Sequence, residues 1–229
     1  MYFGDTTFLI LIPAIILALY AQARVKGTYA RYAKVMARSG VTGAQAARSL
    51  LNSGGAGDVS VDMIQGQLTD NYDPRTKVLH LSGEVYDGRS LASLGIAAHE
   101  CGHALQHQAH YAPLQLRNGF FPVANLGSML AFPLFFIGLL TSSRGPSILM
   151  DLGILLFVAA VLFSVVTLPV EFDASKRAIS ILRTQGLLDG QEIEGARKVL
   201  SAAALTYVAA TAMAILQLVR LLLIRNSRD

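Results

Sequence analysis

Four long apolar runs constrain the fold of this chain more than any other feature. They cover residues 6–23, 120–140, 152–170 and 201–219, and none of them contains a charged residue. Each approaches the roughly 20 residues that a helix needs to cross the hydrocarbon core of a bilayer. Buried core helices of a soluble protein are the alternative, but four such runs rarely share one small domain. Only 15% of the chain is charged, against about 25% in soluble domains. The sequence therefore predicts a polytopic, mainly α membrane protein with about four transmembrane helices.

The first run could instead be a secretory signal peptide, because it ends in Ala-Gln-Ala at residues 21–23, a small-residue pattern. Signal peptides begin with a positively charged segment. Residues 1–5 contain one Asp and no Lys or Arg. We therefore interpret the first run as a retained membrane anchor.

The basic residues predict how the helices are oriented. Of the 19 Lys and Arg residues, 15 lie in residues 24–119 and 171–200. Loops rich in Lys and Arg close to a membrane stay on its cytoplasmic side. We therefore expect both segments to be cytoplasmic in an integral protein of the cytoplasmic membrane, with the loop at 141–147 and both termini outside. Anionic lipid accounts for the net charge of +4, so no nucleic-acid partner is expected.

The cytoplasmic part is predicted to contain a small α+β unit. A capping box at residues 42–45 and the Gly-Gly at 54–55 delimit a helix over 43–51. Residues 59–87 are expected to be extended, with Asp-Pro-Arg-Thr at 73–76 as a turn between two strands. The single cysteine, Cys101, excludes an internal disulfide and suits a reducing compartment. We expect it to be a packed residue rather than a nucleophile.

A helix predicted from Ser90, with Ser90 or Ser93 as its cap, carries the sequence His-Glu-Cys-Gly-His at residues 99–103. His99 and His103 are four residues apart and therefore share one helix face. Two histidines so placed can bind one metal ion, and Glu100 beside them can act as a general base. Gly102 weakens a helix by about 1 kcal/mol, but its missing side chain would let another backbone approach closely.

A catalytic zinc ion needs a third protein ligand. His107 follows His103 on the same straight helix, where tetrahedral geometry is poor; His110 is further along, and His80 falls on a predicted strand. Glu171 comes directly after the third apolar run. Two predicted crossings separate it from the His99 helix, so both lie on the same side of the membrane. This topology favours Glu171 as the third ligand.

"HECGH", followed after two apolar runs by "EFDASKRA" at 171–178, resembles the bacterial membrane neutral zinc metallopeptidase family. The likeness extends to "DNYDPRTKVLHLS" and "YAPLQLRN", and the chain is distantly similar to CAAX prenyl endopeptidases and heat-shock membrane metalloproteases. In those families the first motif pairs with a later E-x-x-A-D. The resemblance implies that one Zn²⁺ per chain is bound by His99, His103 and Glu171, as in gluzincins, with Glu100 as the base. Ser175 stands where the pattern has Asp, so either Ser175 or the nearby Asp173 would support the ligands.

The predicted organisation has five parts. They are a transmembrane helix over 1–23, a cytoplasmic zinc-binding part over 24–119, transmembrane helices over 120–170, a cytoplasmic helical segment with the third ligand over 171–200, and a last transmembrane helix with its tail over 201–229.

The predicted function is a membrane-embedded zinc metalloendopeptidase that hydrolyses peptide bonds of membrane or membrane-proximal proteins with a zinc-activated water. Arg177 is a candidate to stabilise the oxyanion, or a basic residue flanking the membrane. Residues 77–82 form a strand that could offer its edge to an extended substrate or serve only the fold. The alternative is a non-catalytic membrane adaptor with a structural zinc site. Glu100 favours the peptidase, because a structural site has no use for a base.

Overall fold

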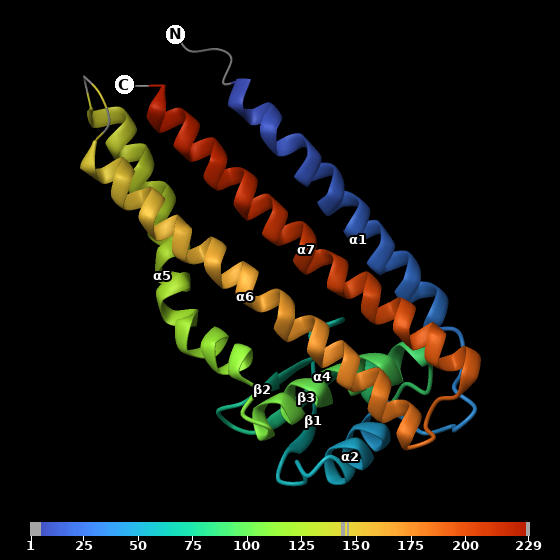
Figure 1. The fold of residues 1–229 in the computed structure, drawn as a ribbon. Helices are drawn as coiled ribbons and strands as arrows, with labels where there is room; N and C mark the ends of the chain where they lie inside the picture. The colour runs from blue at the N-terminus through green and yellow to red at the C-terminus, as the bar shows by residue number, and fades with distance from the viewer. Residues whose placement is uncertain (1–5, 143–144, 146, 228–229) are drawn as a thin grey trace. The chain divides into compact units, whose positions relative to one another are not determined.

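A computed structural model describes residues 6–227 except 143, 144 and 146. The predictions on residues 1–5, the charge of Arg144 and that of Arg228 lie outside this range. The described chain is mainly helical, and four of its helices are long and apolar enough to cross a membrane (Figure 1). These are the 3-10 helix η1 (Thr6–Leu11) continued by α1 (Ile12–Tyr32), then α5 (Ala112–Thr141), α6 (Ile148–Thr184) and α7 (Gly190–Asn226). The expectation of about four apolar, membrane-length helices is confirmed.

Two of these helices extend well beyond the apolar runs of the sequence. Helix α6 continues without a break through Pro169 to Thr184, and α7 begins at Gly190. Glu171 therefore lies on a helix, two residues after Pro169. A helix holds a side chain in a fixed direction, which matters for a residue expected to bind a metal.

The described chain forms two compact units. The first contains the residues up to 20, residues 116–168 and the residues from 206 onward. Phe135 and Met150 lie in its core, where Phe132 packs edge-on against Phe157 with ring centroids 5.3 Å apart. Many other large apolar side chains of this unit are exposed, including Leu140 and Leu155. Soluble proteins rarely expose so much apolar surface, so the unit has the surface of a membrane protein.

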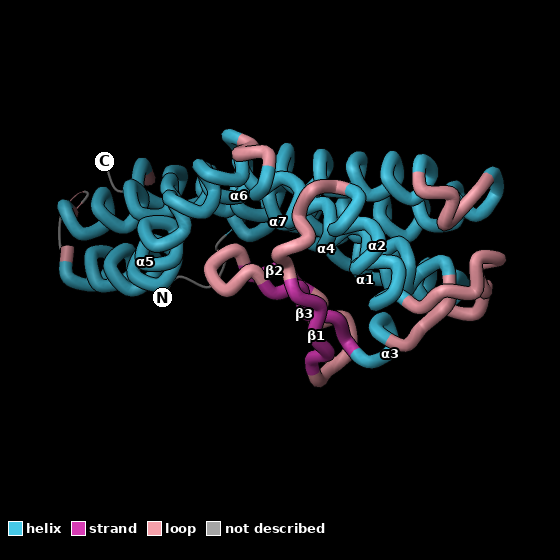
Figure 2. The backbone as a smooth tube through the Cα atoms, turned by 90° about the horizontal axis from the view of Figure 1, so that it is seen from below, coloured by secondary structure: helices cyan, strands magenta, loops and turns pink. Residues whose placement is uncertain are grey.

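The second unit, residues 21–115 and 169–205, contains a three-stranded mixed sheet. Its strands are β1 (Ser60–Ile64), β2 (Asn71–Asp73) and β3 (Val78–Ser82). Figure 2 shows β3 between the other two strands, parallel to β1 and antiparallel to β2. Both edges of β3 are therefore paired within the sheet, and the idea that residues 77–82 offer an edge to a substrate is wrong. The outer edges belong to β1 and β2.

Three short helices complete this unit: α2 (Gly43–Ser53), α3 (Gly83–Tyr86) and α4 (Leu91–Gln108). The capping box predicted for α2 is present, because Thr42 and Gln45 hydrogen-bond reciprocally, and Gly54 ends the helix. The expectation that residues 83–86 are extended is wrong. After Ser82 the chain turns into α3, where the Asp87 N–H donates to the Gly83 carbonyl.

Helix α4 lies in the middle of the second unit. Ser90 caps it by accepting the Ser93 N–H at 3.1 Å, so the first of the two predicted caps is the one observed. Apolar side chains from α2, β3, α4, α6 and α7 form one continuous core around it, with Leu50, Leu81, Leu94, Leu182 and Ile193 fully buried. This packing fixes α4, and with it the residues of the His-Glu-Cys-Gly-His motif.

Candidate metal centre

Helix α4 places His99 and His103 side by side on one face. Their imidazole rings meet edge to face, with centroids 4.8 Å apart. Both side chains are largely shielded from solvent, with 14% and 11% of their side-chain surfaces exposed. Shielded imidazoles with free ring nitrogens are suited to binding a metal.

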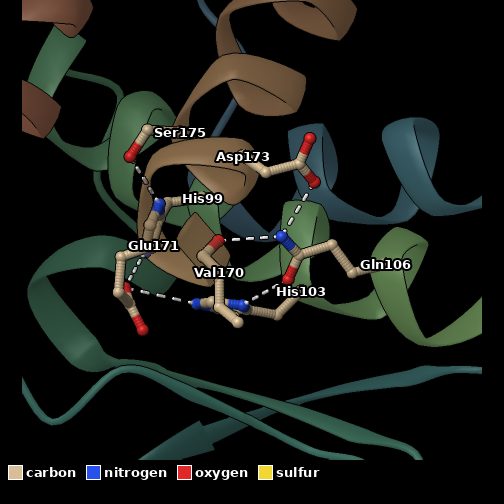
Figure 3. Close-up of polar contacts among 7 residues, drawn as sticks. All are labelled: His99, His103, Gln106, Val170, Glu171, Asp173 and Ser175. Atoms are coloured by element: carbon tan, nitrogen blue, oxygen red, sulfur yellow. Dashed lines mark hydrogen bonds and ion pairs between the residues drawn. The ribbon is translucent and has the colours of Figure 1, made fainter. Parts of the chain in front are cut away.

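Glu171 on α6 faces the two histidines (Figure 3). Its Oε2 atom lies 3.3 Å from Nε2 of His99 and 3.6 Å from Nε2 of His103. The carboxylate is nearly inaccessible, at 3% relative exposure. The structure thus brings together the three residues that the sequence suggested as ligands, from helices separated by 68 residues or more of sequence.

The three side chains fit a zinc ion. One potential ligand atom from each lies within 4.8 Å of the others, and they are the only such group of His, Cys, Asp and Glu in the described part of the chain. Ligand atoms about 2.0–2.2 Å from a tetrahedral zinc ion lie roughly 3.3–3.6 Å from one another. The distances from Glu171 Oε2 to the two Nε2 atoms fall in this range. Imidazole and carboxylate donors are those that zinc takes in catalytic sites.

Gly102 explains how α6 comes close enough to deliver Glu171. A Cβ atom at position 102 would lie 2.5 Å from the carbonyl oxygen of Ala174, closer than real Cβ contacts allow. The close backbone approach that the sequence suggested for Gly102 is therefore present, and the approaching backbone is that of α6.

Glu100 is buried on α4 but is not part of the group of three. Burial raises the pKa of its carboxyl to about 7, while the nearby His99 and the backbone N–H of Tyr72 favour the charged form. A carboxyl group with a pKa close to neutral can both accept and return a proton at physiological pH. The Tyr72 contact also places β2, an outer strand of the sheet, beside Glu100.

Polar side chains contact the far side of each imidazole. Ser175 Oγ lies 3.2 Å from Nδ1 of His99. Gln106 Oε1 lies 3.0 Å from Nδ1 of His103, and the Gln106 amide nitrogen donates to Asp173 Oδ2 at 2.9 Å. Ser175 thus contacts a histidine directly, at the position where related sequences have Asp, whereas Asp173 reaches the other histidine through Gln106. Sequence reasoning missed Gln106, although its spacing of three residues from His103 places both on one helix face.

The remaining candidates have other contacts. Nδ1 of His107 is hydrogen-bonded to the Tyr72 hydroxyl at 2.8 Å, and His110 is exposed. His80 lies on β3, opposite Asp62 and Asn71. None of these three histidines belongs to the group of potential ligands among the described residues.

Arg177 is paired rather than free for an oxyanion. Its Nε donates to Asp173 at 2.5 Å, and its guanidinium lies over the Tyr111 ring at 5.6 Å. Cys101 is fully buried on the opposite side of α4 from solvent, with Sγ 3.7 Å from the Ala47 carbonyl oxygen, and burial raises the pKa of its thiol.

Comparison with known proteins agrees with this site. Residues 7–226 match the model of a family described as "Putative neutral zinc metallopeptidase". The chain is also 48% identical, over 219 residues, to the "Putative membrane protease YugP" of Bacillus subtilis (strain 168), covering 95% of this chain and 96% of that protein. No solved structure shows significant similarity. The family match extends over almost the whole chain, and we conclude that the chain belongs to this family of neutral zinc metallopeptidases.

Proposed function

We propose that the protein is a membrane-embedded zinc endopeptidase in which His99, His103 and Glu171 bind one Zn²⁺ per chain and Glu100 is the general base. One observation carries this proposal. Three side chains converge as potential ligands, while a fourth buried carboxylate beside them is left outside the group. A zinc site of three protein ligands leaves a coordination position open, as catalytic zinc sites require.

The proposed roles follow from the positions of the side chains. A bound zinc ion supplies Lewis-acid activation of a water molecule and of the scissile carbonyl. Glu100 accepts the proton of that water and returns it to the leaving amine. Its buried environment keeps bulk water away from this transfer. Ser175 and Gln106 orient the two imidazoles from behind.

Strand β2 is the proposed platform for the substrate backbone. It is an outer strand of the sheet, and the backbone N–H of Tyr72 reaches Glu100. An extended peptide can pair with such an edge through its own backbone, which gives affinity with little dependence on sequence. The scissile bond of a peptide so bound would lie beside the general base.

The proposed substrates are membrane or membrane-proximal proteins. Glu171 follows the apolar run 152–170 directly on the same helix. A metal bound by Glu171 would therefore lie close to the membrane surface. The distribution of Lys and Arg supports a cytoplasmic location of this side, with the five-part organisation derived from the sequence.

A membrane adaptor with a structural zinc ion is the second candidate. Structural zinc sites are usually closed by four protein ligands. Two observations favour the peptidase: the group has three members in the described residues, and Glu100 is buried beside it.

The proposal is tested by expressing a Glu100→Gln variant in a host that lacks the wild-type protein and comparing membrane proteomes. Full-length substrates should accumulate with the variant and bind to it, and wild type should restore their cleavage. Identical membrane proteomes for the variant, the wild type and the deletion would overturn the proposed proteolysis.

A further inference from the structure

Gln106 is completely buried one turn after His103 on α4. Its side-chain amide contacts three groups. Oε1 lies 3.0 Å from Nδ1 of His103, and Nε2 lies 2.8 Å from the carbonyl oxygen of Val170 and 2.9 Å from Oδ2 of Asp173 (Figure 3). A buried amide costs free energy unless its hydrogen bonds are made. All three contacts therefore constrain how this amide can be oriented.

The two contacts of Nε2 determine which end of the amide faces His103. The Val170 carbonyl can only accept a hydrogen bond, and so can the carboxylate of Asp173, which already accepts from Arg177. Both need the NH₂ group of Gln106. The amide oxygen must then face His103, and a flipped amide is excluded because it would place an oxygen against two acceptors.

The amide oxygen in turn determines where His103 carries its proton. An amide oxygen can only accept, so Nδ1 of His103 must donate and carries the hydrogen. In a neutral imidazole the lone pair is then on Nε2. This is the nitrogen that lies 3.6 Å from Glu171.

We infer that Gln106 is a positioning residue that holds His103 in the Nδ1–H tautomer, with the Nε2 lone pair directed at the metal site. The inference rests on the proposed role of His103 as a ligand. Ser175 cannot do the same for His99, because a hydroxyl can either donate to or accept from Nδ1. The constraint is therefore specific to His103.

Asp173 and Arg177 extend this network. Asp173 holds the Gln106 amide, and Arg177 holds Asp173 through its Nε and packs over Tyr111. The chain of contacts links the metal site on α4 to the helical turn that follows Glu171 on α6. Two polar residues whose roles the sequence left open are thereby given one function, which is to fix the amide.

Zinc affinity of the purified full-length protein in detergent tests the inference without using peptidase activity. A chromophoric chelator competes for the zinc, and Gln106→Leu is compared with Gln108→Leu, an exposed glutamine on the same helix. Loss of a group that orients a metal-binding histidine typically lowers affinity by about 10–100-fold. We expect this loss for Gln106→Leu and no change beyond about twofold for Gln108→Leu.

A charge exchange keeps the test valid if Gln106→Leu fails to fold. Gln106→Glu alone places two carboxylates at the position of the Gln106–Asp173 contact and should weaken zinc binding. Gln106→Glu combined with Asp173→Asn restores both an acceptor for His103 and a donor that holds it. The double variant should therefore bind zinc more tightly than the single variant.

Three results would overturn the inference. They are a Gln106→Leu affinity within about twofold of wild type, a double variant that binds no better than Gln106→Glu, and nitrogen NMR of the zinc-bound protein that places zinc on Nδ1 of His103. Each of these leaves the proposed function standing. A wild-type protein that binds no zinc would instead overturn the proposed function, and this inference with it.

Discussion

The missing side chain of Gly102 lets the backbone of Ala174 approach α4, since a Cβ atom at Gly102 would lie 2.5 Å from the Ala174 carbonyl oxygen. Helix α6 carries Glu171 less than one turn earlier. The close approach of the two helices thus sets the distance between Glu171 and the two histidines.

Gly102→Ala should separate the two helices. Alanine favours a helix over glycine by about 1 kcal/mol, but overpacking against a backbone costs about 1–3 kcal/mol. We expect a lower thermal unfolding midpoint and weaker zinc binding, measured by thermal unfolding and chelator competition in detergent. Gly27→Ala, in open space on α1, is the matched control and should be neutral or stabilising. Equal behaviour of the two variants would contradict the packing argument.

Glu171→Ala should remove one of three proposed zinc ligands. Zinc affinity should fall by more than the roughly 10–100-fold that the loss of a supporting residue causes. Glu194→Ala is the control, because Glu194 is an exposed carboxylate paired with Arg197 on the surface of α7. Zinc content after dialysis measures the difference. If Glu171→Ala kept wild-type affinity, another residue would have to be the third ligand.

Cys101 should resist modification in the folded protein. It is fully buried, and burial raises the pKa of its thiol, so little reactive thiolate forms at neutral pH. A water-soluble thiol reagent should label the protein only after denaturation, and Cys101→Ala should retain zinc. Rapid stoichiometric labelling of the native protein would show that the thiol is accessible.

Chelation of zinc should abolish peptidase activity but leave the fold intact. The core of the second unit is built from apolar side chains of α2, β3, α4, α6 and α7, away from the metal ligands. Circular dichroism should show unchanged helicity in the metal-free protein, and added zinc should restore activity. Unfolding on zinc removal would favour the structural-zinc adaptor instead.

Much of the fold was predictable because its signals are local. The apolar runs, the capping box at Thr42 and the Ser90 cap each depend on neighbouring residues, and all are found in the structure. The central position of β3 was not predictable, because a strand sequence does not reveal which strands pair on its two sides. The helical turn at residues 83–86 was missed because four residues carry almost no periodic signal.

The candidate site was partly predictable. The motif gave His99, Glu100 and His103, and the predicted topology placed Glu171 on the same side. The contacts behind the imidazoles required coordinates, since Gln106 and Asp173 come from helices that are distant in sequence. Nothing in the spacing alone indicates that a glutamine side chain would connect them.

The central claim is that Glu100 is the base and not a ligand. Glu100→Gln keeps the size of the side chain but cannot accept the proton, and general-base catalysis contributes about 10²–10⁴-fold to rates.

The deciding measurement is zinc content and peptide hydrolysis on the same purified Glu100→Gln sample, beside wild type. The account predicts wild-type zinc content with hydrolysis reduced by about 10²-fold or more. Hydrolysis at the wild-type rate, or loss of zinc from Glu100→Gln, would contradict it.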